Sequence, residues 1–240
     1  MSNTLIIPIK NESGNIKHVF ESVSSLNIFS RIIFIEGGST DETLEELLNN
    51  LVLSRDTRII VMQQKVTNCK FGAILEALVK VDSEFITILD GDRTIRDEDI
   101  NKALTIMHNN SNCIVVGNRL TPDREQGAMP ILNLFGNKIF AVLCSIIVKQ
   151  KISDALSGLK ILPTSLLKSK SCEAILDIDK YGDLTILFMA ARKKLRIINS
   201  DCKYQRRSFG KSSINKLQGS LNLLHTYFHV LYHKCYTDKN

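Results

Sequence analysis

The most informative residues of this chain are two acids, Asp90 and Asp92, which stand one residue apart after an apolar run, Phe85–Leu89. Because the run predicts a buried strand, both carboxylates would emerge where the strand stops and the chain turns. Two carboxylates in that position can share one hard cation such as Mg²⁺ or Mn²⁺. Such a cation bridges the phosphates of a nucleotide and neutralises charge on a leaving group. The open alternative is a simple turn or helix cap, where Asp and Gly are common.

A second acidic segment, Glu36–Thr43, also follows an apolar run. Its two glycines allow a ligand to approach the backbone, and Ser39 or Thr40 is able to cap the next helix. Acids at such a strand end can accept hydrogen bonds from base N–H groups or ribose hydroxyls. The first strand ends similarly, in Pro8–Glu12. Three consecutive strand ends with polar loops predict one rim of a ligand site, with helix capping alone as the alternative.

Positive charge is concentrated in residues 191–216, which contain nine Lys or Arg and one acid, Asp201. This stretch carries +8, whereas the whole chain carries +6. A local basic patch predicts contact with phosphate or with an anionic surface, and a solvated basic face is the alternative. We expect no nucleic-acid partner, because aromatic residues make up only 6% of the chain, Trp is absent and no nucleic-acid-binding motif occurs.

The elements that position these residues alternate between strand and helix. Strands are predicted over residues 4–9, 31–35, 58–63, 85–89 and 113–117, and helices over 15–25, 43–53, 72–81 and 96–109. The strands are continuous apolar runs, as expected where helices cover both faces of a sheet. The alternation therefore predicts an α/β fold with a mostly parallel central sheet, whose ligands bind at the carboxyl ends of its strands.

The second half of the chain is less regular. A polar loop at 121–127 precedes an apolar helix over 129–149, and a turn with Asp154, Ser157 and Gly158 follows. Further helix and a strand at 195–198 are predicted next, and the tail from Ile214 has the spacing of an amphipathic helix. The apolar helix, the basic stretch and the tail together favour peripheral attachment to a membrane. Burial of the 129–149 helix in the core is the alternative.

Length and composition predict one domain in a reducing compartment. The chain has 240 residues, of which 44% are hydrophobic and 23% charged. No apolar run reaches the roughly 18 residues of a spanning helix, and no basic leader with a cleavage site opens the chain. Its 6 cysteines never form C-x-x-C. The expected location is the cytoplasm, with peripheral contact at the cytoplasmic face of a membrane.

Six short segments follow one another over about residues 4–215. They are Pro8–Glu12 (pattern P-x-x-N-E), Ile35–Thr43 (V-D-D-G-S-T-D-x-T), Leu89–Asp92 (L-D-A-D), Val115–Arg119 (V-V-G-S-R), Asp154–Gly158 (D-x-x-S-G) and Tyr204–Ser213 (Y-x-x-R-x-x-G-x-S). In this order they resemble the inverting family 2 glycosyltransferases of the GT-A fold. The nearest group is the dolichyl- or polyprenyl-phosphate sugar transferases and related bacterial enzymes.

The resemblance implies a Rossmann-like GT-A domain over residues 1–240. Its nucleotide-sugar-binding half would span about 1–120, and its acceptor-side half, with C-terminal amphipathic helices, about 121–240. The implied binding residues for a UDP- or GDP-sugar are Pro8, Lys10, Glu12, Glu36, Ser39, Asp41, Gly72, Asp90 and Gly91. Asp90 and Asp92 would hold Mg²⁺ or Mn²⁺. The implied phosphate- or acceptor-binding residues are Arg119, Ser157, Arg206, Arg207, Lys211 and Ser213.

The reaction that the resemblance implies is direct displacement at the anomeric carbon, with Asp154 and Asp92 as catalytic residues. A polyprenyl phosphate is the favoured acceptor, and a glycan hydroxyl, deprotonated by Asp154, is the next. Three departures from the family pattern are Gly37 for an acid, Thr94 for a Gln that often binds metal, and Pro130 for an Arg. They keep open a non-catalytic GT-A-like protein that binds nucleotide sugars or regulates, and a nucleotidyltransferase is a third alternative.

Overall fold

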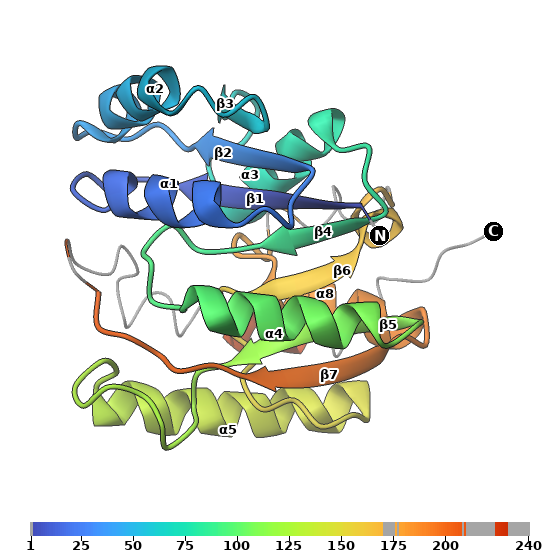
Figure 1. Cartoon of the computed structure of the whole chain (residues 1–240). Helices are drawn as coiled ribbons and strands as arrows, with labels where there is room; N and C mark the ends of the chain where they lie inside the picture. The colour runs from blue at the N-terminus through green and yellow to red at the C-terminus, as the bar shows by residue number, and fades with distance from the viewer. Residues whose placement is uncertain (1, 170–175, 177, 208, 210–223, 230–240) are drawn as a thin grey trace.

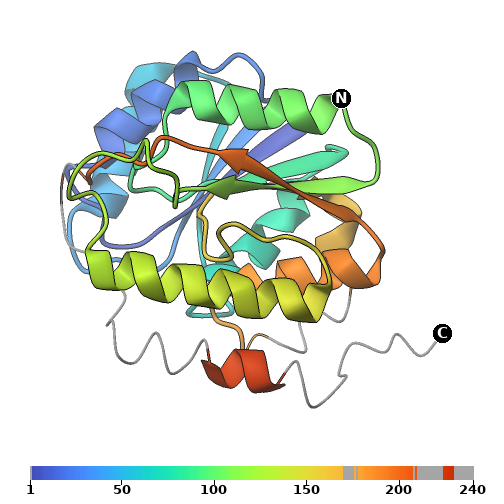
Figure 2. The same cartoon turned by 90° about the horizontal axis from the view of Figure 1, so that it is seen from below.

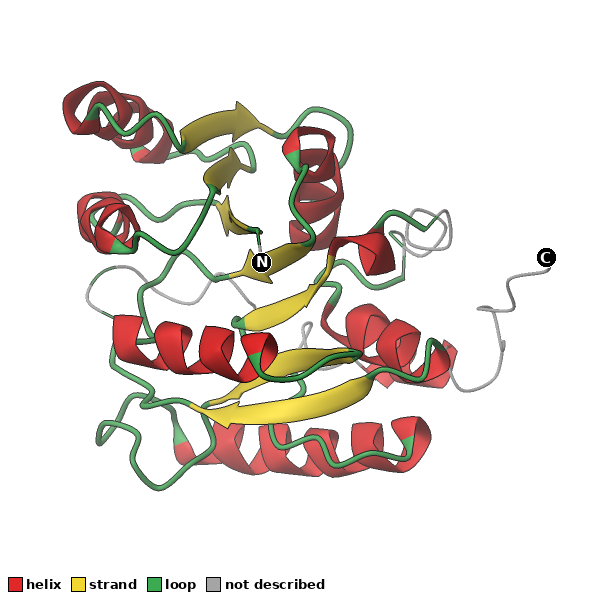
Figure 3. Cartoon of the chain, turned by 45° about the vertical axis from the view of Figure 1, so that its right-hand side comes forward, coloured by secondary structure: helices red, strands yellow, loops and turns green. Residues whose placement is uncertain are grey.

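The computed structural model describes residues 2–169, 176, 178–207, 209 and 224–229. Within this part of the chain, the strands form one sheet in the order β3-β2-β1-β4-β6-β5-β7. Neighbouring strands run parallel except where β6 pairs antiparallel with β4 and with β5. Helices cover both faces of the sheet (Figures 1 and 3). The expected α/β fold with a mostly parallel central sheet is confirmed.

The first half of the chain follows the predicted alternation. Its strands are β1 (Asn3–Ile9), β2 (Arg31–Glu36), β3 (Ile59–Gln63), β4 (Phe85–Ile88) and β5 (Cys113–Asn118). Its helices are α1 (Ile16–Ser25), α2 (Thr43–Ser54), α3 (Lys70–Ala77), which continues into the 3₁₀ turn η1 (Leu78–Lys80), and α4 (Asp97–His108). The boundaries shift by only one or two residues from the predicted ones because Gly, Asp and Asn punctuate the sequence between elements.

The second half contains α5 (Ile131–Val148), β6 (Lys160–Pro163), α6 (Thr164–Leu167), α8 (Asp183–Arg192) and β7 (Arg196–Asp201). The further helix predicted after Gly158 corresponds to α6 and α8, but β6, which precedes them, was not predicted. Strand β6 was hidden by Lys160, a charged residue that is 1% exposed. Its ammonium lies 2.5 Å from Asp183 of α8, and this buried ion pair allows lysine inside the sheet. Of the predicted C-terminal amphipathic helix, only residues 224–229 are described, and they are helical.

The core lies on both sides of the sheet because the strand residues alternate between its faces. In β1, Leu5 and Ile7 pack with residues of α1, α2 and α4. Ile6, between them, packs on the opposite face with residues of α3, α5 and α8. A sheet buried on both faces has its polar functions at its ends, which directs attention to the strand termini.

Candidate active site

The predicted site segments lie along one edge of the sheet. Strands β1, β2 and β4 are parallel, and because β6 is antiparallel to both its neighbours, β5 and β7 point in the same direction as β4. The loops that follow these strands, and the loop that leads into β6, therefore gather at one edge, on the left of Figure 1. This edge is where open α/β sheets bind their ligands.

The Asp90–Asp92 turn directly follows β4. Asp90 is partly exposed, with 35% of its side-chain surface accessible, and Gly91 is buried against β1. A Cβ atom on Gly91 would come within 2.8 Å of Ile9 Cγ1, so glycine is what lets the turn approach the end of β1. Oδ1 of Asp92 accepts hydrogen bonds from the amide and the hydroxyl of Thr94, the latter at 2.8 Å. Thr94, a departure from the family pattern, thus orients Asp92.

Lys70, which the sequence analysis missed, is the nearest cation to this turn. It opens α3, and its Nζ lies 2.5 Å from Oδ1 of Asp90. Burial opposes charge on both groups, but their attraction outweighs it, so that the pKa of Asp90 is lowered and that of Lys70 is raised. The signal that could have revealed this role was the position of Lys70, two residues before the predicted start of a helix at Gly72.

Arg207 links two strand ends. Its Nη1 donates to Glu12 Oε1 at 3.1 Å and its Nη2 donates to Asp92 Oδ2 at 2.9 Å. Burial raises the pKa of Glu12, an effect that Arg207 partly offsets and that the charges of Asp92 and Asp90 reinforce. The two acids of the turn and Glu12 are therefore close enough to influence one another, and Arg207 neutralises part of their charge.

The loops after β1 and β2 are hydrogen-bonded to each other. The Asn11 amide donates to Ser39 Oγ at 2.9 Å, and Glu36, which is 2% exposed, accepts the Ser39 amide. Asp41 accepts from the Thr43 hydroxyl and amide, which lowers its pKa although partial burial acts in the opposite direction. Through these hydrogen bonds, Ser39 and Asp41 hold the loops that form the rim of the predicted ligand site.

The remaining residues predicted for the nucleotide sugar surround these loops. Pro8 lies in β1, half-buried beside β2, and Lys10 donates to Asn68 at 2.9 Å. Gly72 is buried in the first turn of α3, where a Cβ atom would lie 1.9 Å from Thr67 Oγ1. Glycine at this position lets α3 begin close to the loop after β3.

Arg119 and Asp154 form a buried ion pair on the other side of the Asp90–Asp92 turn. Arg119 Nε and Nη2 donate to the two oxygens of Asp154 at 2.7 and 3.0 Å, and the carboxylate is 0% exposed. Asp154 also accepts the backbone amides of Arg119 and Leu156. The Arg119 guanidinium lies 5.4 Å from the ring centroid of Tyr204. Every oxygen of Asp154 is thus engaged in holding Arg119.

The other residues predicted to bind phosphate or the acceptor differ in their exposure and contacts. Ser157 is buried, and its Oγ accepts the Leu159 amide. Arg206 is exposed and joins the segment after β7 to the loop before α5, donating its Nε to Gln126 O at 2.7 Å. Lys211 and Ser213 lie outside the described residues.

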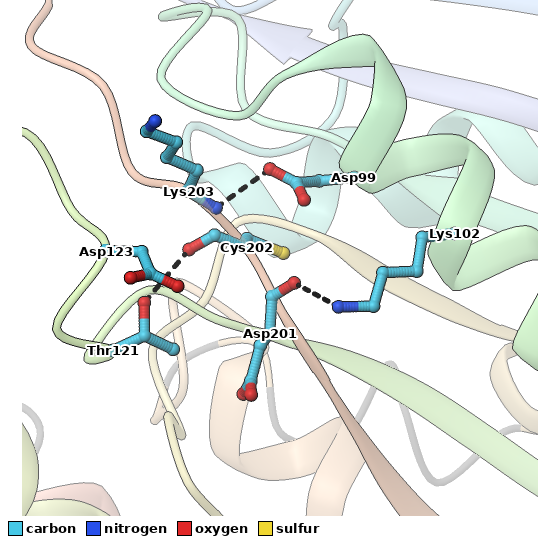
Figure 4. A pocket seen from close by; sticks show the side chains of 7 residues that line it. All are labelled: Asp99, Lys102, Thr121, Asp123, Asp201, Cys202 and Lys203. Atoms are coloured by element: carbon cyan, nitrogen blue, oxygen red, sulfur yellow. Dashed lines mark hydrogen bonds between the residues drawn. The ribbon is translucent and has the colours of Figure 1, made fainter.

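A separate polar hollow of about 270 Å³ lies between α4 and the end of β7 (Figure 4). Its lining residues are Asp99, Lys102, Thr121, Asp123, Asp201, Cys202 and Lys203. Hydrogen bonds within the lining hold it together: the Lys203 amide donates to Asp99, and Lys102 Nζ donates to the Asp201 carbonyl. None of these residues was predicted for the site.

The carboxylates of the Asp90–Asp92 turn are compatible with a divalent cation in an open site. Among the described residues, no group of three or more His, Cys, Asp or Glu side chains is arranged to enclose a metal ion. Two carboxylates without further protein ligands suit Mg²⁺ or Mn²⁺ when water and substrate phosphates complete the shell. The partly exposed Asp90 and the oriented Asp92 provide such a pair, with Lys70 and Arg207 balancing their charge.

The sheet order, the acidic turn after β4 and the polar loops along one edge define a GT-A-type glycosyltransferase. The chain belongs to glycosyl transferase family 2, whose family model matches residues 4–169, and it is a glycosyltransferase enzyme. The resemblance stated from the sequence is confirmed.

Three known proteins illustrate this similarity. The chain is 28% identical over 207 residues to a UDP-N-acetylglucosamine–dolichyl-phosphate N-acetylglucosaminyltransferase of Methanococcus voltae, covering 80% of this chain and 81% of that protein. It is 31% identical over 155 residues to the glycosyltransferase AglJ of Haloferax volcanii, covering 64% of this chain and 48% of that protein. The fold matches glucosyl-3-phosphoglycerate synthase of Mycobacterium tuberculosis, crystallised with Mn²⁺, UDP and phosphoglyceric acid, with a TM-score of 0.70, 15% identity and coverage of 98% and 78%.

Proposed function

We propose that this enzyme transfers a sugar, with inversion, from a UDP-sugar to a polyprenyl phosphate, with Mg²⁺ or Mn²⁺ held by Asp90 and Asp92. The observation that carries the proposal is the pair of acids after β4, each paired with a cation, Lys70 or Arg207, at the ligand-binding edge. The dolichyl-phosphate acceptor and UDP-linked donor named for the Methanococcus relative support the choice of substrates. A GDP-sugar and a glycan acceptor are the alternatives within the same reaction.

The donor would lie across the loops after β1, β2 and β4. Pro8, Lys10, Glu12, Glu36, Ser39 and Asp41 would surround the nucleoside, and the diphosphate would lie over Gly91 between Lys70 and Arg207. A metal ion at Asp90 and Asp92 would neutralise the diphosphate and so stabilise the departing nucleoside diphosphate. Lys70 adds a second positive charge at this point, which the sequence motif alone did not include.

In the proposed reaction an acceptor phosphate oxygen attacks the anomeric carbon, a new C–O bond forms, and the bond from that carbon to the diphosphate oxygen breaks. The electron pair leaves with the nucleoside diphosphate. Because a phosphate oxygen is already anionic, the step needs no general base. Arg207, which can release Asp92 and Glu12 when a diphosphate enters, would take up the developing charge.

Arg119 is the cation that we assign to the acceptor phosphate. Its Nε and Nη2 donate to Asp154, which fixes the orientation of the guanidinium and leaves Nη1 to contact a phosphate. We infer that Asp154, whose oxygens are already occupied by Arg119 and two backbone amides, acts as a positioning residue for a phosphate acceptor. A role as general base applies only to a hydroxyl acceptor and would require Asp154 to release Arg119.

The test is a donor and acceptor panel. The purified chain is incubated with UDP- or GDP-sugars and Mn²⁺, with and without a polyprenyl phosphate, and the nucleoside diphosphate released is measured together with the lipid-linked product. We expect release that depends on the UDP-sugar and on the lipid phosphate. Asp92→Asn should reduce the rate at least a hundredfold, whereas Asp123→Asn, an exposed acid in the separate hollow, should leave it unchanged. Equal rates in both variants would contradict the proposal.

A further inference from the structure

The outer face of α5 is a continuous apolar stripe. Six side chains on it are between 53% and 83% exposed: Ile131, Leu132, Phe135, Ile139, Val142 and Ile146. At about 100° per residue, these six fall within an arc of about 100°. The opposite face of α5 carries Phe140, Ala141, Cys144 and Val148, which are buried in the core. The stripe is therefore separate from the core face of the helix. It is larger than the isolated hydrophobic side chains that are normal on a protein surface.

A second helical segment, residues 224–229, packs against α5. The Tyr227 ring lies 6.2 Å from the ring of Phe140 on the core face of α5, and its hydroxyl donates to the Leu143 carbonyl at 3.5 Å. From this second helix Leu224 and Phe228 are 40% and 49% exposed. Figure 2 shows both helices on the same side of the molecule. Two helices far apart in the sequence thus expose apolar side chains on the same side of the molecule.

The charged residues of α5 and of the short segment after it are all positive. Between Gln126 and Ser153 the sequence has no Asp or Glu, and its only charged residues are Lys138, Lys149 and Lys151. All three lysines are exposed. An apolar helix face accompanied by lysines is the pattern that binds the interface of an anionic bilayer, where the apolar side chains enter the acyl boundary and the ammonium groups meet the headgroups.

The stripe is joined directly to the site. The loop before α5 is bonded to the segment after β7, because the Glu125 amide donates to the Tyr204 carbonyl at 2.8 Å and the Arg206 amide to Glu125 Oε2 at 2.8 Å. The next residue, Arg207, contacts Glu12 and Asp92. A surface that contacts α5 from its first turn onward would therefore lie beside the acceptor end of the site.

We propose that the outer face of α5, extended by residues 224–229, docks the enzyme on the surface of a bilayer that contains anionic lipid. In the described part of the chain, α5 is the one helix that by length and composition could cross a membrane, so the expectation that no apolar segment reaches this length was wrong. It lies flat instead of spanning, because its other face belongs to the core of the sheet domain. The inference rests on the proposed lipid-linked acceptor for its purpose, whereas its structural basis is the stripe and its lysines.

Vesicle flotation of the full chain tests this proposal. The probes are vesicles of phosphatidylcholine alone and vesicles with about one third phosphatidylglycerol. The first variant is Phe135→Glu with Ile139→Glu, and the matched control is Val52→Glu with Leu53→Glu on α2, whose side chains are 76% and 78% exposed. We expect the wild type and the control to float with anionic vesicles and less with neutral ones. The α5 variant should partition at least tenfold less.

Two further measurements make each result decisive. Circular dichroism and UDP titration in the presence of Mn²⁺ should be the same for all three proteins, because these positions are outside the site. Equal flotation of both variants, or no flotation of the wild type, overturns the docking surface. Sedimentation that shows a wild-type dimer dissociated by the α5 variant, without flotation, assigns the stripe to a second copy and also overturns it. Absence of UDP binding in a wild type that floats would instead overturn the proposed function.

Discussion

The ammonium of Lys70 lies 2.5 Å from Oδ1 of Asp90. Lys70 therefore contacts the same carboxylate that we propose as a ligand of the divalent cation. A metal ion at Asp90 would therefore compete with Lys70 for the charge of this acid, and the diphosphate of the donor would offer the ammonium a second partner. Binding experiments can therefore measure how strongly Lys70 and a metal ion compete for Asp90.

Lys70→Met should raise the affinity for Mn²⁺ severalfold when no donor is present, because the metal no longer competes with the ammonium. It should lower the affinity for the UDP-sugar about tenfold, because one charge opposite the diphosphate is lost. Isothermal titration of each ligand measures both effects. Lys17→Met, an exposed lysine on α1, is the control and should change neither. A loss of Mn²⁺ affinity in Lys70→Met would contradict this reasoning.

The same variant has a pH dependence with a fixed sign. The pKa of Asp90 lies below its ordinary value of 3.8 and that of Lys70 above 10.5, so the pair stabilises the folded chain between these values. The contribution is lost as the pH falls through the lowered pKa of Asp90. Thermal melts should show a higher Tm for the wild type than for Lys70→Met at pH 7, and the two Tm values should converge as the pH falls below the lowered pKa of Asp90. A difference that grows towards acid would be incompatible with this ion pair.

Arg207→Ala removes the cation that joins Glu12 and Asp92. We expect about a tenfold loss of affinity for UDP in the presence of Mn²⁺, because the diphosphate loses a charged hydrogen-bond donor. Arg207→Lys should recover only part of it, since an ammonium cannot reproduce two divergent N–H contacts. Arg93→Ala is the control, because Arg93 is exposed and donates to the His18 carbonyl instead. Titration curves that coincide for Arg207→Ala and wild type would exclude this role.

Asp154→Asn separates a positioning role from a general base. If Asp154 only holds Arg119, the variant should raise KM for the lipid phosphate more than it lowers kcat, and the pH profile of kcat should keep its shape. Its free energy of unfolding should fall by about 3 kcal/mol, because a buried guanidinium loses its carboxylate. Loss of the acidic limb of the pH profile, with KM unchanged, would assign Asp154 to proton transfer instead.

Gly158→Ala tests the packing behind the acidic turn. A Cβ atom at this position would lie 2.2 Å from Asp90 Oδ2, so the carboxylate must move. We expect Mn²⁺ affinity in the presence of UDP to fall at least tenfold. Gly136→Ala is the matched control, because a Cβ there meets nothing within 4 Å and should add about 0.5–1 kcal/mol of helix stability. Unchanged Mn²⁺ affinity in Gly158→Ala would show that moving the Asp90 carboxylate does not affect metal binding, and would contradict this prediction.

Most of the fold was predictable because its first half consists of apolar strands and amphipathic helices in strict alternation. The local pattern of apolar residues is sufficient to predict a strand that is buried on both faces. It failed at β6, a four-residue strand that begins with Lys160, a charged residue whose burial is balanced by Asp183 of a distant helix. A pairing between residues far apart in the sequence cannot be deduced from local periodicity.

The site was predictable as a set of loops but not as a network of contacts. The positions of Asp90, Asp92 and Glu12 at strand ends follow from the motif spacing. The bridge from Arg207 to Glu12 and Asp92 depends on how β7 is placed at the far edge of the sheet, which no local pattern encodes. Lys70 was missed for a similar reason, since only the packing of α3 against β1 and β2 brings it to Asp90.

The most direct test of the central claim is calorimetric titration of UDP into the chain with and without Mn²⁺, repeated for Asp90→Asn with Asp92→Asn. The account predicts binding that requires Mn²⁺ in the wild type and a loss of that metal-dependent binding in the double variant. UDP affinity that is identical with and without Mn²⁺, or that survives the double substitution in the presence of metal, would contradict it.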